Sequence, residues 1–215
     1  MRIVIYGAGG FGLEMRRHVL RDTKRLGFDG PAYASDSADQ IGSTLLGLPV
    51  ISPAAFTADD RCVLAVGSSR HRRAMAERCP GFHTIIAESA VIDGGITFNE
   101  GSVICDQTIF TADDRTVLGA HFHCNFQSYV GHDCVIGDFV TFGPRVGVNG
   151  NVRIGDDVYI GSGALIRNGV PGHPLVIGRG ATIGMGAVVT RDVPPGVTVV
   201  GNPARPLVQR PQLAA

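Results

Sequence analysis

The sequence predicts an α/β protein of two parts, a small βαβ sheet followed by a parallel β-solenoid. Three observations predict it: a glycine-rich turn between a strand and a helix, a change of pattern near residue 85, and a six-residue repeat beyond that point. The chain has 30 Gly in 215 residues, about twice the usual share of roughly 7%. Because there is no G-X-Y period, we expect the glycines in ordered turns.

The first 20 residues have the order strand, glycine-rich turn, helix. Residues 2–6 (RIVIY) form a β-branched run, residues 7–12 read GAGGFG, and residues 13–20 have a helical pattern. In this order the glycines let backbone amides and a helix N-terminus approach a phosphate. The candidate ligand-binding glycines are Gly7, Gly9 and Gly12.

Two further strands are expected at 32–34 and 62–66. Asp36 follows the first of them, where an acidic group can reach a ribose hydroxyl, and Gly67 and Ser68 follow the second. The alternative is that the glycines only close a tight turn and Asp36 only caps a loop. A full dinucleotide fold needs two such halves, so this single half favours a nucleotide or a nucleotide-linked ligand over a dehydrogenase.

The second half of the chain repeats every six residues. An aliphatic or small residue opens each hexad, Gly, Asn or Asp follows it in nine of ten cases, and a second column comes four places later. Two inward columns predict a hexapeptide solenoid with three hexads, or 18 residues, in each coil. The first column is Ala112, Leu118, Cys124, Val130, Ile136, Phe142, Val148, Ile154, Ile160 and Ile166, and the second is Thr116, Phe122, Ser128, Cys134, Val140, Val146, Val152, Val158, Ala164 and Val170.

Both ends of this repeat need an adjustment. The register breaks after Val170 and resumes at Ile177, so residues 169–175 are expected to form a loop outside the solenoid. Upstream, a one-residue shift extends the inward column to Val91, Thr97, Val103 and Ile109. The predicted boundaries are 1–85 for the N-terminal domain, 86–205 for the solenoid and 206–215 for a C-terminal tail.

The register also separates core residues from candidate catalytic ones. Cys124 and Cys134 fall in inward columns, which indicates core packing and disfavours an acyl-cysteine mechanism. His132 falls in an outward column beside Asp133, and Asp113 and Asp114 come about one coil earlier, so a carboxylate can orient the ring. Gly150, one coil later, places no side chain over the imidazole and leaves space for a thioester arm.

Residues 87–205 resemble the left-handed β-helix acyltransferases, through the hexads and the segments TRDVPPGV (190–197) and GNPAR (201–205). With GAGGFG in front, the whole chain resembles the bacterial sialic-acid and amino-sugar acetyltransferases of the NeuD/PglD type. The resemblance implies a Rossmann-like N-terminal domain for a nucleotide-sugar. It also implies a left-handed parallel β-helix that forms a homotrimer and takes acetyl-CoA as co-substrate.

The same resemblance suggests roles for individual residues. Segment 131–138 matches the family segment that carries the catalytic histidine, here His132, and Asn125 matches an asparagine near the active site, although a turn residue explains Asn125 equally well. Thr141 stands where some relatives have a second histidine that helps to bind the acetyl donor. The positions that match donor contacts are Gly150, Ser162, Gly184, Met185, Gly186, Arg191 and Arg205.

The predicted function is acetyl-CoA-dependent N-acetylation of a nucleotide-linked 4-amino-4,6-dideoxysugar, with a histidine general base, for bacterial surface glycan or lipopolysaccharide synthesis. One alternative is O-acetylation of a sugar hydroxyl, as for sialic acid. Another, of a different class, is a non-catalytic solenoid that binds nucleotide-sugars.

Composition excludes other classes. The net charge of +0 gives no electrostatic reason to expect a nucleic acid or a membrane as partner. Five cysteines without a CxxC pair, and no signal-peptide or membrane-span pattern, favour a soluble cytoplasmic protein. His121 and His123 are expected to point outward, but the three-histidine spacing of zinc solenoids resembling γ-class carbonic anhydrases is absent, so no metal is expected. The other histidines are expected at the surface or in loops: His18, His71, His83 and His173.

Overall fold

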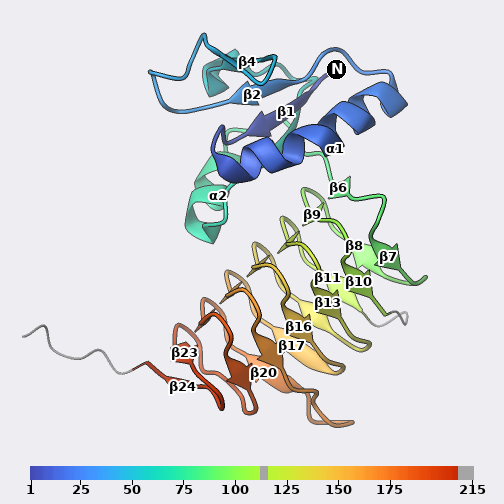
Figure 1. Cartoon of the computed structure of the whole chain (residues 1–215), viewed down its shortest axis with the longest axis vertical. Coiled ribbons are helices and arrows are strands. Elements are labelled where there is room, and N and C mark those ends of the chain that lie inside the picture. Colours follow the sequence, from blue (N-terminus) through green and yellow to red (C-terminus); the bar gives the residue numbers. More distant parts are fainter. Residues whose placement is uncertain (112–115, 208–215) are drawn as a thin grey trace, which may run out of the picture.

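The computed structural model describes residues 1–111 and 116–207. Its N-terminal part is a five-stranded sheet with two helices, placed over a long stack of coils (Figure 1). The sheet order is β3-β4-β2-β1-β5, parallel except for the β3–β4 pair. Its elements are β1 (Ile3–Tyr6), α1 (Gly10–Leu26), β2 (Ala32–Ala34), β3 (Thr44–Leu45), β4 (Leu48–Ile51), the 3₁₀ turn Pro53–Ala55, β5 (Arg61–Leu64) and α2 (Ser69–Ala76).

Strand β1 is buried on both faces because a helix covers each of them. Ile3 and Ile5 belong to the core cluster that includes Met15 and Val19 of α1. Val4 and Tyr6 point to the other face, into a cluster that includes Met75 of α2. The alternation of strand side chains therefore divides this core into two layers, and it explains why β1 is apolar along its whole length.

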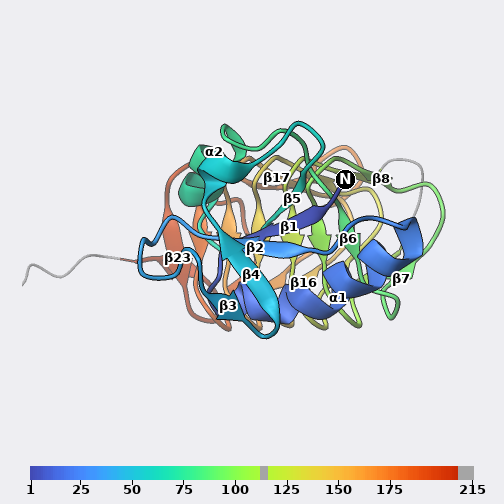
Figure 2. The same ribbon diagram turned by 90° about the horizontal axis from the view of Figure 1, so that it is seen from above.

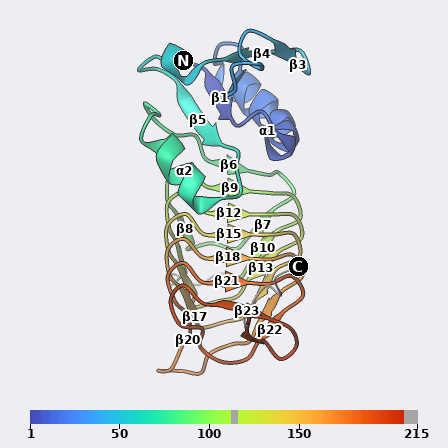
Figure 3. The same cartoon turned by 90° about the vertical axis from the view of Figure 1, so that its left-hand side faces the viewer.

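The rest of the chain is a parallel β-solenoid of the hexapeptide-repeat type, with three sheets that we call faces 1, 2 and 3 (Figure 3). Face 1 contains β6 (Ile85–Ile86), β9 (Val103–Ile104), β12 (His123–Cys124), β15 (Thr141–Phe142), β18 (Tyr159–Ile160), β21 (Thr182–Ile183), β23 (Thr198–Val200) and β24 (Arg205–Pro206). Face 2 contains β7 (Val91–Ile92), β10 (Ile109–Phe110), β13 (Tyr129–Val130), β16 (Gly147–Val148), β19 (Leu165–Ile166) and β22 (Val188–Val189). Face 3 contains β8 (Thr97–Phe98), β11 (Val117–Leu118), β14 (Val135–Ile136), β17 (Val152–Ile154) and β20 (Leu175–Ile177).

The predicted inward columns from residue 116 to 166 are confirmed, since their members are buried. Ala112 lies outside the described residues. Val170, predicted to be inward, is exposed, because the solenoid register ends before it. The predicted loop after residue 168 is confirmed: Ile154 pairs with Ile177, 23 residues later instead of 18.

The upstream extension of the column was wrong. Val91 and Ile109 are 53% and 43% exposed, and Thr97 is exposed as well. Val103 is buried, but in the N-terminal core cluster and not inside the solenoid. Ile109 pairs with Tyr129, so this coil is two residues longer than the 18-residue coils below it. The residues that pack against or within the solenoid core here are the next ones along: Ile92, Phe98, Ile104 and Phe110.

The glycines at the corners are needed for close approach between coils. A Cβ atom on Gly131 would lie 2.7 Å from the backbone nitrogen of Gly150, and one on Gly119 would lie 2.4 Å from the carbonyl carbon of Gly137. The left-handed backbone occurs two places later, at residues such as Asp133 (φ 59°). The sequence predicted glycines at the corners. It did not predict that close packing between coils and the left-handed backbone fall on different residues.

The N-terminal part lies against face 1, as the view from above shows (Figure 2). His121 and His123 point away from the solenoid core, as predicted, but they are not exposed to solvent, because the N-terminal part covers them. Their rings contact Phe82 and Phe11 respectively, with centroids 4.4 Å and 5.4 Å apart. Within the part of the chain that the structure describes, no helix is long and apolar enough to span a membrane.

Candidate functional site

His132 and Asp133 form a pair at the corner between faces 2 and 3. The Nδ1 atom of His132 lies 2.7 Å from Oδ2 of Asp133. The two side chains of neighbouring residues can meet because Asp133 has a left-handed backbone (φ 59°), a conformation that aspartate tolerates better than most residues. The histidine side chain is 64% exposed, as its outward column predicted.

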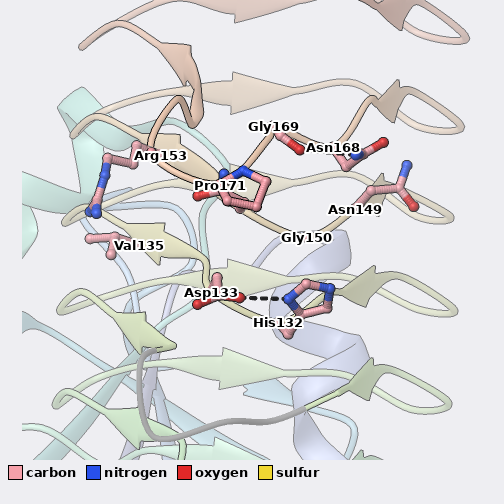
Figure 4. A pocket seen from close by; sticks show the side chains of 11 residues that line it. His132, Asp133, Val135, Asn149, Gly150, Arg153, Asn168, Gly169 and Pro171 are labelled. Atoms are coloured by element: carbon pink, nitrogen blue, oxygen red, sulfur yellow. Dashed lines mark hydrogen bonds and ion pairs between the residues drawn. The ribbon is translucent and has the colours of Figure 1, made fainter.

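This pair lies in the wall of a cleft with a volume of about 770 Å³. One side is formed by the next coil, and another by the loop after residue 168 (Figure 4). An ionised carboxylate can only accept a hydrogen bond, so Asp133 holds the proton of the imidazole on Nδ1 and leaves Nε2 as an acceptor. The cleft residues are His132, Asp133, Val135, Asn149, Gly150, Asn151, Arg153, Asn168, Gly169, Pro171 and Gly172.

Gly150 lies against the imidazole of His132. A Cβ atom at this position would be 2.6 Å from both Cε1 and Nε2 of the ring. The missing side chain at residue 150 does leave space, as predicted, but the imidazole of His132 fills this space. Gly150 is therefore required for the position of His132.

The other partners predicted for His132 were Asp113, Asp114 and Asn125. Asp113 and Asp114 lie outside the described residues. Asn125 is at the opposite edge of face 2, where its side-chain amide donates to the carbonyl of Phe142 at 3.1 Å. Within one chain, Asn125 thus supports a corner between coils, which fits the turn interpretation.

A second cleft, of about 370 Å³, opens in the N-terminal part and includes Gly7, Gly9 and Asp36. It lies at the N-terminus of α1, where Gly9 provides no side-chain cap and the first turn carries no acidic residue. Backbone amides there are oriented to receive an anion. Gly12 is not part of the cleft; a Cβ atom on it would be 1.9 Å from the carbonyl oxygen of Gly7, so it permits the close packing of helix on strand.

Asp36 is held by two neighbours. Its carboxylate accepts two hydrogen bonds from Arg78, at 2.7 and 3.0 Å, and the hydroxyl of Tyr6 lies 3.0 Å from it. The Arg78 guanidinium holds the pKa of Asp36 below its usual value. Asp36 is therefore a fixed, ionised acceptor at the edge of the cleft.

Gly67 and Ser68 line a third cleft, of about 360 Å³, between the start of α2 and face 1. Its solenoid side includes Thr141 and Tyr159. Two of the predicted nucleotide-site residues thus face the solenoid and do not join the cleft at Asp36.

Of the predicted donor positions, only Gly150 lies in the His132 cleft. Ser162, Gly184, Met185 and Gly186 belong to the corners between faces 1 and 2, and Met185 is 78% exposed. Arg191 and Arg205 are exposed, and Arg205 donates to the carbonyl of Ala204. Thr141 is buried beneath the N-terminal part, where it bonds Arg72 and Gly67.

The inward cysteines of the solenoid are core residues and not nucleophiles. Cys124 and Cys134 are buried as predicted, and burial raises the pKa of Cys124 well above its usual value, which disfavours a thiolate nucleophile. Among residues 1–111 and 116–207 no group of three or more His, Cys, Asp and Glu side chains could hold a metal ion. His18, expected at the surface, is 4% exposed because it packs beside Asp106 of the solenoid.

Several cleft residues were missed by the sequence analysis, among them Asn149, Arg153 and Asn168. Asn168 lies 36 residues, or two coils, after His132, so adding the 18-residue coil length twice would have found it. Asn149 and Arg153 lie 18 residues after the neighbours of His132, Gly131 and Val135. The loop after residue 168 was predicted, but its position beside His132 was not.

Comparison with known proteins identifies the family of the chain. Residues 133–168 match the family model for bacterial transferase hexapeptide (six repeats). The chain is 39% identical over 217 residues to GDP-perosamine N-acetyltransferase of Escherichia coli O157:H7, with 96% of each chain covered. The chain belongs to the hexapeptide-repeat sugar acetyltransferases. This confirms the predicted NeuD/PglD-type resemblance and makes the protein an acyltransferase.

Two solved structures extend the likeness to nearly the whole chain. WeeI from Acinetobacter baumannii AYE has a TM-score of 0.88 and 41% identity, covering 96% of this chain and 100% of that one. The acetyltransferase domain of PglB from Neisseria gonorrhoeae FA1090 in complex with acetyl coenzyme A has a TM-score of 0.81 and 31% identity, covering 96% and 98%.

Proposed function

We propose that this acetyltransferase transfers the acetyl group of acetyl-CoA to the amino group of a nucleotide-linked 4-amino-4,6-dideoxysugar, for surface glycan synthesis. The observation that carries the proposal is the His132–Asp133 pair in the wall of an open cleft. The relative in Escherichia coli acts, by its name, on GDP-perosamine, and the PglB domain binds acetyl coenzyme A.

His132 acts as general base in this proposal. The amine nitrogen attacks the thioester carbonyl and Nε2 of His132 takes an amine proton, while a new C–N bond forms. The tetrahedral intermediate then expels CoA as the C–S bond breaks, and the imidazolium returns its proton to the leaving thiolate. Asp133 stabilises the protonated ring and fixes its tautomer.

The N-terminal part, residues 1–85, is assigned as a Rossmann-like domain for the nucleotide. The free N-terminus of α1 suits a phosphate, and Asp36 supplies a fixed acceptor for a hydroxyl or base donor. Residues 86–205 form the acetyl-transfer domain, with 206–215 as a tail. Its donor contacts are assigned to the matched positions, Gly150 first because it lies beside His132.

We also propose a homotrimer in the cytoplasm. Face 2 presents an outward column of largely apolar residues, of which Val91, Ile109 and Leu165 are strongly exposed. Burial of such a column against a second copy removes it from water. All five cysteines are free thiols, as suits a reducing compartment.

The test is thiol release from acetyl-CoA with a panel of nucleotide-linked sugars that carry either a 4-amino or a 4-hydroxyl group, followed by NMR of the product. The proposal predicts turnover with the amino sugars and an amide product. Release of thiol only with hydroxyl sugars would assign the enzyme to O-acetylation. No release with any sugar would contradict the proposal.

A further inference from the structure

Arg72 carries a charge into the boundary between the two parts of the molecule. It belongs to α2, which lies beside the upper coils of the solenoid (Figure 3), and it is 0% exposed. Its Nη1 donates to the carbonyls of Val66 (3.0 Å) and Gly67 (2.9 Å) and to the hydroxyl of Thr141 (2.7 Å). Its Nη2 donates to the carbonyl of Phe139 at 2.6 Å.

These partners are all neutral. Burial of the guanidinium lowers its pKa, and no carboxylate bonds it among the described residues. A buried charge with neutral partners is a poor source of stability, since an apolar side chain of similar size often serves as well. What a guanidinium adds is a rigid fork of donors that fixes several acceptors at once.

The acceptors that it fixes lie on two separate segments. Val66 lines the cleft with Gly7 and Asp36, whereas Phe139 and Thr141 belong to the solenoid. The carbonyl of Gly67 receives a second hydrogen bond from the Thr141 hydroxyl, at 3.0 Å. The turn from Val66 to Ser68 is thus tied to face 1 through one side chain and one hydroxyl.

This tie also orients the amides of the turn. In a trans peptide the N–H points opposite to the C=O, so the Ser68 amide points away from Thr141 and Arg72. Within residues 1–111 and 116–207, the backbone amides of Gly67 and Ser68 donate no hydrogen bond. They are free to bind a ligand that spans the two parts.

We propose that Arg72, together with Thr141, is a positioning residue that holds the Val66–Ser68 turn in place for the nucleotide-sugar. The inference rests on the proposed function, since it takes the nucleotide-sugar as the ligand of this turn. Acetyl-CoA is bound by the solenoid in that scheme, so Arg72 acts on one substrate and not on the other.

Arg73 provides a matched comparison. It is the next residue of α2 and also reaches the solenoid, by a two-point ion pair with Asp157 (2.8 and 3.1 Å). Its side chain is 37% exposed, and it contacts none of the turn carbonyls that Arg72 bonds. Surface pairs of this kind contribute little, so Arg73 ties the same helix to the same face without holding the turn.

The experiment measures KM for the nucleotide-sugar, KM for acetyl-CoA and Tm in four variants of the full-length enzyme. Arg72→Met is expected to raise the KM for the sugar about ten-fold, with the KM for acetyl-CoA unchanged, as the loss of charged hydrogen bonds implies. Thr141→Val should raise the KM for the sugar about three-fold, because the hydroxyl loses its hydrogen bonds with Gly67 and Arg72 while the guanidinium keeps its bonds to the turn carbonyls. Arg72→Lys should lie between wild type and Arg72→Met, and Arg73→Met should match wild type.

Three results would overturn the inference: a lower Tm with unchanged KM for the sugar, an equal rise in both KM values, or an equal rise in Arg73→Met. If Arg72→Met does not fold, Thr141→Val and Arg72→Lys carry the same test, since each keeps a side chain of similar size. A wild-type enzyme that turns over no nucleotide amino-sugar refutes the proposed function instead, so the two failures are distinguishable.

Discussion

Gly150 links the coil geometry to the chemistry of one side chain. The imidazole of His132 is placed where a Cβ atom of residue 150 would stand. His132 is exposed and can swing aside, whereas the contact of Gly131 with the next coil is made to backbone atoms that cannot move separately. Two glycines one coil apart therefore have different roles.

We predict that Gly150→Ala lowers kcat about 100-fold while Tm changes by less than 2 °C, because the ring is displaced without overpacking the core. Gly131→Ala should instead lower the free energy of unfolding by about 1–3 kcal/mol, because the added methyl group overpacks the contact with the next coil. Steady-state thiol release and calorimetry on the two variants check this. Equal activity in Gly150→Ala and wild type would show that the ring position does not matter.

At the scale of elements, the sequence predicts the repeating columns of the solenoid and misses the contacts between segments that are far apart in the chain. The columns from 116 to 166 followed from local spacing, and so did the loop after residue 168. The column upstream of the 20-residue step from Ile109 to Tyr129 was misread, because a one-residue shift fits Val91 and Ile109 as well as the true column fits Ile92 and Phe110.

Contacts between elements could not be read from spacing at all. The repeat places His121, His123 and Thr141 on the outer surface of face 1, and it contains no information that the N-terminal part covers them. The same holds for the site: His132 and its cleft follow from the register, whereas the partners of Asp36 and the burial of Arg72 depend on how separate elements pack.

The burial of histidines at this boundary predicts a pH dependence. Burial, with Arg72 and Arg73 nearby, lowers the pKa of His121 to about 4, and burial lowers the pKa of His123 well below its usual value. In the unfolded chain these rings titrate at about 6.5. Protons therefore bind the unfolded state first as the pH falls, so stability is complete above 6.5 and is lost toward pH 4.

We expect Tm to fall by about 5 °C or more between pH 7 and 4.5, since His121 alone contributes ~2 kcal/mol over that range and His123 acts in the same direction. The lowered pKa values of Asp36 and Asp60 place their effects at more acid pH. His123→Leu should flatten the dependence, and His173→Leu, at an exposed loop histidine, should leave it unchanged. A wild-type Tm that is constant over this range would contradict the burial argument.

At the scale of the whole molecule, the single chain leaves an apolar column open on face 2. Leu165, on β19 of that face, is 44% exposed. We predict that Leu165→Glu prevents association, because a charge cannot be buried without a partner, and that it lowers activity if the His132 cleft is completed by a second copy. Light scattering of wild type should give a trimer, with Thr97→Glu on face 3 as the control; a monomeric, fully active wild type would reject the shared site.

The central claim is that His132 is the general base of acetyl transfer to a nucleotide-linked amino sugar. The most direct measurement is the single-turnover rate of amide formation in wild type and His132→Ala, with both substrates saturating. We expect this rate to fall about 10²- to 10⁴-fold, with Tm and substrate affinities preserved. A rate in His132→Ala close to that of wild type would contradict it.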